Sequence, residues 1–163
     1  MAHRIKSSTI GFYLDSHLFP GTKQGLNPDL SSSGVLLLAP FCGKPACQMI
    51  YAQAGKGVCA DAFVSRKPLV VPNVGELFFK LGVNVFYNII TILDVDEYPG
   101  HITCDGETRS ELVLPLLLQT AQGGEVALGL LDLDCLALDG FKREDVEGLQ
   151  AIVDLVVSSC DWY

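Results

Sequence analysis

The chain has 163 residues, of which 49% are hydrophobic, which is typical of one folded domain rather than a disordered segment. Its formal net charge of −8 argues against nucleic acid and anionic membranes as partners, because both attract basic surfaces. Apolar stretches are broken well short of the roughly 18 residues of a transmembrane helix, and no apolar core of signal-peptide length is found near the N-terminus. We therefore expect a cytoplasmic protein with reduced thiols.

The N-terminal half alternates short apolar runs with turn-rich segments. Residues 15–33 are rich in Gly, Pro, Asn and Ser and predict a long surface loop. Two glycines in GKGVC precede a short helix that we expect to begin near Val58. The strands predicted in this half are 10–14 (IGFYL), 34–40 (GVLLLAP, buried), 47–52 (CQMIYA) and a run in 68–74 that Pro72 closes (PLVVPNV).

The C-terminal half carries the clearest periodicity. ELVLPLLL and EVALGLLDLDCLAL predict two strands joined by a turn at QGG. Residues 143–159 place valines and leucines at helical spacing, with acids in the first turn. The pattern predicts a single α+β domain over 1–163, with a mainly antiparallel sheet of about six strands and flanking helices.

Two acids interrupt the second of these strands. Asp132 and Asp134 point to one face of the strand, whereas Leu131 and Leu133 point to the other. The acids either form a solvated outer face or receive an ammonium group or a metal, since two close carboxylates repel unless a cation lies between them. Glu111 opens the neighbouring strand and is placed to join them.

Six cysteines require an explanation in a cytoplasmic chain, where they act as buried filler, metal ligands or redox groups. Cys104 stands out because it follows His101 in a polar loop, GHITCDG, whereas cysteine usually prefers apolar burial. Cys47 and Cys59 end the turns GKPAC and GKGVC. At the predicted helix start, Cys59 should be favoured as thiolate by the helix dipole and by Lys56.

The remaining thiols give weaker signals. Cys135 falls on the leucine face of its strand and is expected in the core, while Cys42 and Cys160 have no activating neighbours in sequence. A zinc site of cysteines with His101 is disfavoured by the absence of a short C-x₂-C spacing. His101 itself is more simply a surface loop residue.

Four segments together resemble the free methionine-R-sulfoxide reductases, small enzymes with a GAF fold. The segments are GKPAC, GKGVC, PGHITCDGETRSE and LGLLDLDCLALDGF, and they occur in the same order as in that family. The resemblance implies thiol-dependent reduction of free L-methionine-(R)-S-oxide to methionine. It implies no metal and no resident cofactor, with thioredoxin as the external reductant.

The resemblance also implies roles for individual residues. Cys104 matches the catalytic cysteine, which would become a sulfenic acid, and Cys47 matches the resolving cysteine that would form a disulfide with it. Cys59 matches an auxiliary cysteine. The residues that match the substrate pocket are Glu111, Asp132, Asp134 and Tyr13. Clustered carboxylates would select the ammonium group of a free amino acid and help to protonate the sulfoxide oxygen.

The chain departs from the family at three places. Thr9 stands where the family has a tryptophan, the helical segment expected ahead of GFYL is missing, and residues 75–95 form an apolar insertion. We interpret 75–95 as a gene-model error, with a genuine extra hairpin as the alternative. The departures leave two other functions open, a GAF domain that binds a small molecule without catalysis and an inactive family member. The sequence does not decide whether the chain forms a homodimer, as homologous GAF proteins often do.

Overall fold

The computed structural model describes residues 7–19, 34–71, 90–91 and 107–162. Its centre is a sheet with the strand order β3-β2-β1-β7-β6-β4-β5, in which β4 and β5 run parallel and all other neighbours are antiparallel. The strands are β1 (Ser7–Asp15), β2 (Val35–Gly43), β3 (Met49–Tyr51), β4 (Leu69–Val71), β5 (Ile90–Thr91), β6 (Ser110–Gln119) and β7 (Glu125–Cys135).

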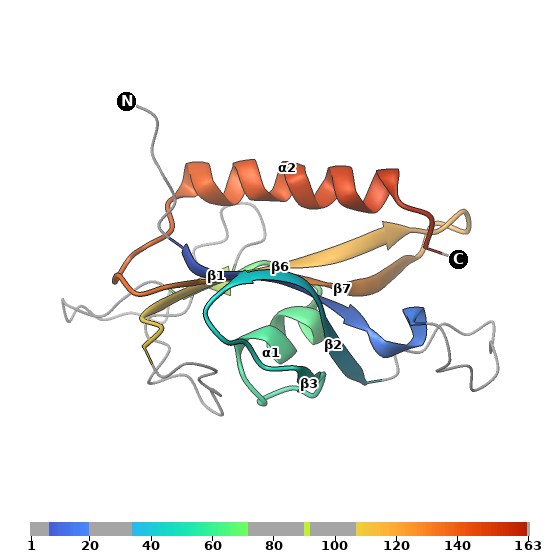
Figure 1. Ribbon diagram of the computed structural model, residues 1–163. Coiled ribbons are helices and arrows are strands. Elements are labelled where there is room, and N and C mark those ends of the chain that lie inside the picture. The colour runs from blue at the N-terminus through green and yellow to red at the C-terminus, as the bar shows by residue number, and fades with distance from the viewer. Residues whose placement is uncertain (1–6, 20–33, 72–89, 92–106, 163) are drawn as a thin grey trace.

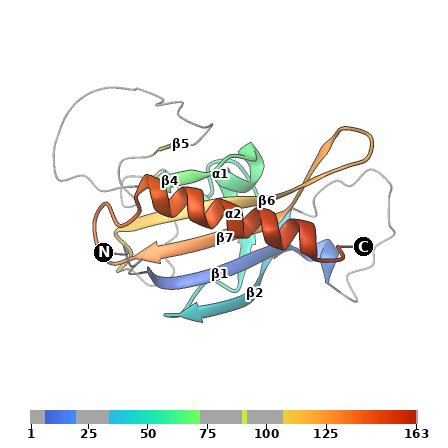
Figure 2. The same ribbon diagram turned by 90° about the horizontal axis from the view of Figure 1, so that it is seen from above.

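Two helices lie on opposite faces of this sheet. The long helix α2 (Arg143–Ser159) covers one face, and the short helix α1 (Val58–Ser65) lies with β3 on the other (Figure 1). Viewed from above, α2 runs over the middle of the sheet, with β2 toward one edge and β4 and β5 toward the other (Figure 2). The α+β prediction, with a mainly antiparallel sheet, is confirmed.

Strand alternation separates the two faces chemically. Leu131 and Leu133 on β7 are buried in the core beneath α2, together with Leu112 and Leu114 of β6. The opposite face of the same strands contributes to a second core around α1, which includes Val113. Since side chains of a strand alternate between faces, one sequence pattern fills both layers.

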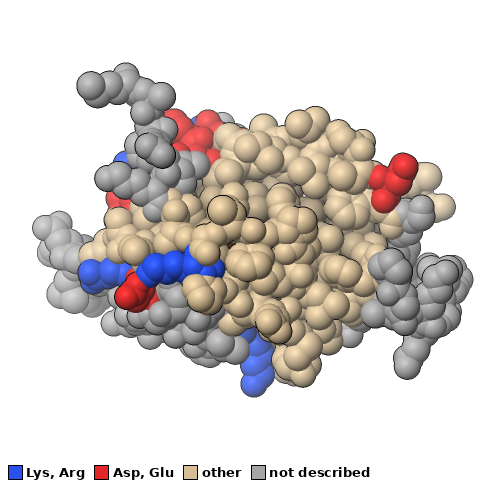
Figure 3. Space-filling model, in the orientation of Figure 1, with Lys and Arg blue, Asp and Glu red and all other residues tan. Residues whose placement is uncertain are grey.

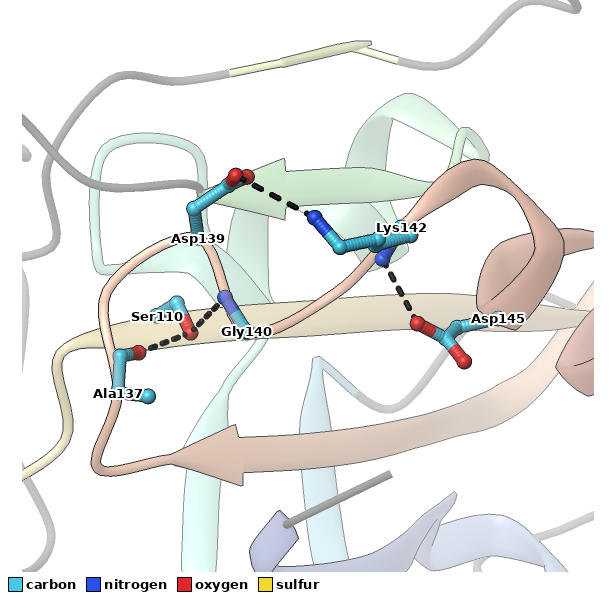
Figure 4. Close-up of polar contacts among 6 residues, drawn as sticks. All are labelled: Ser110, Ala137, Asp139, Gly140, Lys142 and Asp145. Carbon is cyan, nitrogen blue, oxygen red and sulfur yellow. Dashed lines mark hydrogen bonds and ion pairs between the residues drawn. The ribbon is translucent and has the colours of Figure 1, made fainter. Parts of the chain in front are cut away.

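Hydrogen bonds join the loop between β7 and α2 to the start of β6 (Figure 4). The hydroxyl of Ser110 donates to the carbonyl of Ala137 at 2.7 Å and accepts from the backbone N–H of Gly140 at 3.1 Å. Next along the chain, the backbone N–H of Lys142 donates to the Asp145 carboxylate at 2.8 Å, which caps the first turn of α2. The loop therefore fixes the end of β6 that carries Glu111.

Several element predictions need correction. The predicted strand at 34–40 extends to Gly43, and it is not buried throughout, because β2 lies next to the edge of the sheet and is exposed from Pro40 to Gly43. The strand at 10–14 is longer on both sides, and the strand at 47–52 shrinks to the largely exposed β3. At the start of the predicted 15–33 loop, Ser16–Leu18 form a 3₁₀ turn, and residues 20–33 lie outside the described residues.

Only two residues of the predicted insertion at 75–95 are described. They form β5, which pairs with β4. The other residues of that segment lie outside the described part of the chain, so its interpretation as a gene-model error stays a prediction.

The described surface is unevenly charged. In the orientation of Figure 1, most of the visible surface is uncharged, and a row of Lys and Arg side chains reaches from the left margin toward the middle (Figure 3). Exposed apolar side chains lie at the edge of the sheet formed by β2 and β3: Phe41 on β2, and Met49 and Tyr51 on β3. Among the described helices, none has the length and apolar character needed to cross a membrane.

Candidate functional site

A cavity of about 680 Å³ opens on the α1 side of the sheet. Its walls come from β1, β3, α1, β6 and β7, together with the turns on either side of β3. This volume is within the range of about 300–1,000 Å³ that is typical of small-molecule sites. The lining includes six of the seven residues that the sequence proposed: Tyr13, Cys47, Cys59, Glu111, Asp132 and Asp134.

Strand register brings the three acids together. Glu111 on β6 is directly opposite Asp134 on β7, and Asp132 lies two residues along the same face of β7. Glu111 is only 4% exposed and Asp132 only 9%. The alternative of a solvated outer face, considered for Asp132 and Asp134, is therefore wrong for Asp132.

Burial and mutual repulsion change the ionisation of this group. Burial, and then the charge of Asp134, raises the pKa of Glu111 from its ordinary 4.5 to about 8. Burial and the neighbouring Glu111 also raise the pKa of Asp132 well above its usual range. With a pKa of about 8, the Glu111 carboxyl group holds its proton at neutral pH and can serve as a proton donor, so the site has the chemistry of a general acid.

Cys59 lies beside the three acids. It lies in the first turn of α1, and its Sγ is 3.5 Å from Glu111 Oε1. The expectation that this cysteine is a favoured thiolate is wrong. Burial, together with the charges of Asp132 and Glu111, raises its pKa well above the ordinary value.

Tyr13 forms the wall next to the acids. It is 1% exposed and pairs with Leu130 of β7, two residues from Asp132 on the same face. Burial and the Asp132 charge raise the pKa of its phenol, so the hydroxyl keeps its proton. Thr9 pairs with Asp134 and is also buried, and its Oγ1 has no hydrogen-bond partner among the described residues.

The described cysteines differ in whether they form a disulfide. Cys47 is engaged in a disulfide, whereas Cys42, Cys59, Cys135 and Cys160 form none. Cys135 is buried in the core beneath α2, as its position on the leucine face predicted, and Cys42 and Cys160 are exposed. Cys104 and His101 lie outside the described residues.

Sequence reasoning missed part of the cavity wall. Thr108, which is buried, contributes to the lining, as do Ile50 from β3 and Val58 from α1. Thr108 could have been found because it lies within the GETRSE segment, three residues before Glu111. The apolar residues gave no such signal, since their place depends on how β3 and α1 pack.

Similarity to known proteins agrees with this architecture. A model of the GAF domain matches residues 12–159. The chain belongs to the GAF domain family. This GAF domain is 39% identical to the free methionine-R-sulfoxide reductase of Saccharomyces cerevisiae over 80% of the chain and 57% of that relative.

Two solved structures of reductases resemble it as well. The reduced free methionine-R-sulfoxide reductase of Staphylococcus aureus is 29% identical, with a TM-score of 0.63 over 94% of this chain and 71% of the other. The Neisseria meningitidis enzyme, solved in complex with its substrate, is 28% identical, with a TM-score of 0.62 over 93% and 66%. The GAF domain described here thus spans between half and two thirds of the length of the curated relatives that it matches.

Proposed function

We propose that this GAF domain reduces free L-methionine-(R)-S-oxide to L-methionine. The observation that carries the proposal is the cavity in which Glu111, Asp132 and Asp134 stand beside a cysteine-bearing wall. The likeness to reductases that act on this substrate supports the same conclusion. A buried acid cluster needs a cation, and a free amino acid supplies one in its ammonium group.

The acids give the site its selectivity for a free amino acid. An ammonium group bound between Glu111 and Asp132 would favour their ionised forms and offset the burial and repulsion that raise their pKa values. A methionine sulfoxide inside a peptide has no such group and would leave the acids unpaired. Protons displaced from the cluster are available to the sulfoxide oxygen when its bond to sulfur breaks.

The redox steps are assigned to Cys104 and Cys47. The Cys104 thiolate attacks the sulfoxide sulfur, the substrate is reduced to the thioether, and Cys104 is oxidised by two electrons to a sulfenic acid. The Cys47 thiol then attacks that sulfur, so that water leaves and a disulfide forms. Thioredoxin, rather than a resident cofactor, reduces this disulfide by thiol exchange.

The state of the cysteines supports the role of Cys47. It lines the cavity and is engaged in a disulfide, while the four other described cysteines form no disulfide. Cys59 lines the same cavity, and we assign it the auxiliary role in recycling. Its raised pKa makes it a poor first nucleophile, because the thiol form dominates.

The cysteine roles are tested by turnover with thioredoxin, its reductase and NADPH. We expect Cys104→Ser to abolish methionine release and Cys47→Ser to allow about one turnover before it stalls, since no disulfide can form for thioredoxin to reduce. Cys42→Ser, an exposed and unbonded position, serves as the matched control and should turn over normally. Steady turnover by Cys47→Ser contradicts the resolving role.

Thr9 favours a second candidate, a domain that binds the sulfoxide without reducing it. This residue occupies the position of the family tryptophan and leaves a buried hydroxyl without a partner among the described residues. Calorimetric binding of the sulfoxide with no methionine release, in a chain whose cysteines are all reduced, identifies this case. A gain in turnover from Thr9→Trp assigns the loss to that residue.

We also infer that two copies associate through the uncharged edge formed by β2 and β3. Phe41 and Tyr51 are more than a third exposed there, the two strands contain no charged residue, and a chain with net charge −8 repels its copy least where charges are few. Sedimentation equilibrium should give a dimer that Phe41→Lys dissociates. A monomer for the unaltered chain contradicts the inference.

A further inference from the structure

The cavity contains three ligand atoms of two chemical kinds in one place. The Cys59 sulfur and one carboxylate oxygen each of Glu111 and Asp132 all lie within 4.8 Å of one another. Two of these residues come from neighbouring strands of the sheet and the third from α1, so the elements of the fold itself hold the group together. We call it the acid–thiol cluster.

The spacing within the acid–thiol cluster suits a tetrahedral metal ion. Zinc binds sulfur at about 2.3 Å and carboxylate oxygen at about 2.0–2.2 Å, and at the tetrahedral angle this places the two ligand atoms about 3.6 Å apart. Cys59 Sγ and Glu111 Oε1 are 3.5 Å apart. These two atoms therefore need almost no movement to bind one ion.

An unpartnered buried atom gives independent evidence for a ligand. Asp132 is 9% exposed, and its Oδ1 has no hydrogen-bond partner among the described residues, whereas the carboxyl group as a whole hydrogen-bonds with Cys59 and Glu111. A buried carboxylate oxygen that makes no bond is costly, and native structures rarely retain one without a role. Asp132 also lines the cavity, through which a cation could reach the acid–thiol cluster.

We propose that the acid–thiol cluster binds a thiophilic divalent cation, with Zn²⁺ as the representative ion, through Cys59, Glu111 and Asp132. Three protein ligands leave a fourth tetrahedral position open toward the cavity. The mixed sulfur and oxygen donors favour zinc over Mg²⁺ or Ca²⁺, which prefer oxygen ligands alone. This site differs from the zinc site considered from the sequence, which combined several cysteines with His101.

The ion would compete with the substrate, an inference that rests on the proposed reductase function. Zinc and the ammonium group of methionine sulfoxide would both neutralise Glu111 and Asp132, so the two cannot occupy the cluster together. Zinc would therefore raise the KM for the sulfoxide and leave kcat unchanged. A reductase with this site is inhibited when free zinc rises.

Binding is tested without substrate, so that its outcome is independent of the reductase activity. The chain is used with the Cys47 disulfide intact and is titrated with Co²⁺, whose bond to a thiolate gives a charge-transfer absorption band. Added Zn²⁺ then displaces the cobalt and reports the zinc affinity. We expect the unaltered chain to give this band with one equivalent of Co²⁺. The Cys59→Ser chain should give no band, and its zinc affinity should be at least about tenfold lower.

Matched variants separate this site from metal binding elsewhere. Cys42→Ser and Cys160→Ser remove exposed thiols and should keep the band. Glu111→Gln should keep the band but weaken zinc binding, and it provides the test if Cys59→Ser does not fold. An absent band, a band retained in Cys59→Ser, or unchanged zinc affinity in Glu111→Gln overturns the proposal. Absence of methionine release bears only on the proposed function.

Discussion

The two faces of the sheet are built from the same strands but have opposite physical character. On the α2 side, Leu131 and Leu133 of β7 are fully buried among other apolar side chains. On the α1 side, Asp132 and Asp134 of that strand face a cavity, and the pKa of the buried Asp132 is strongly raised. Alternation along one strand thus separates a stabilising face from a face that is costly to bury.

The contrast assigns stability to one face and chemistry to the other. Burying leucine side chains contributes about 1.5–3 kcal/mol each, whereas desolvating a carboxylate opposes folding. A buried polar group that is costly to keep in a native fold commonly marks a functional site. Substitutions on the two faces should therefore have opposite effects on stability and activity.

The largest expected effect is on the apolar face. Leu133→Ala should lower the free energy of unfolding by about 2–5 kcal/mol, because it leaves a cavity beneath α2. Urea denaturation measures this loss. Leu155→Ala, at an exposed position of α2, is the control and should change stability little. Equal losses in both variants contradict the described core.

On the acid face, Asp132→Asn should lower kcat/KM for free methionine-R-sulfoxide by about 100-fold, because a buried partner of the substrate ammonium loses its charge. Stability should not fall, since the variant no longer buries a carboxylate. Steady-state kinetics and urea denaturation on one preparation test both statements. Asp154→Asn on α2, far from the cavity lining, is the control for charge removal.

The pH dependence of stability sharpens the contrast further. Because the pKa of Glu111 is raised from 4.5 to about 8, the native chain holds this proton more tightly than the unfolded chain. The stabilisation is present below pH 4.5 and is lost as pH rises through about 8. Glu111→Gln should therefore unfold less readily than the unaltered chain at pH 8, by on the order of 1–3 kcal/mol.

At pH 5 the two chains should differ much less, because Glu111 is then neutral in the native state. Denaturation at a series of pH values measures the difference directly. A gap that is the same at pH 5 and pH 8 shows that Glu111 is not a buried acid with a raised pKa.

The smallest effect concerns the loop between β7 and α2. A Cβ added at Gly140 would lie 2.6 Å from Cys135 Sγ and 2.7 Å from Ser110 Oγ, so Gly140→Ala should cost about 1–2 kcal/mol. Gly148→Ala, where a Cβ meets nothing within 4 Å in the middle of α2, should instead stabilise slightly. Thermal denaturation distinguishes the two signs. A Gly140→Ala chain as stable as the original contradicts the tight packing of this loop.

The features that the sequence predicted correctly are those that depend on neighbouring residues. The alternation of Asp132 and Asp134 with leucines, and the helical spacing of 143–159, depend on neighbours in sequence, and both predictions are confirmed. The ionisation of Cys59 depends on its burial and on the charges of Asp132 and Glu111, which the fold brings from strands distant in sequence, so helix position alone gave the wrong prediction. Likewise, the exposure of β2 follows from its place near the sheet edge, which hydrophobicity does not encode.

The central claim is that the acid face recognises a free amino acid and presents its sulfoxide for reduction. The most direct test measures methionine release from free methionine-R-sulfoxide, with thioredoxin, its reductase and NADPH, beside the S epimer and the N-acetylated R epimer. The account predicts release from the free R epimer alone. Equal release from the N-acetylated compound, which has no ammonium group, would contradict it.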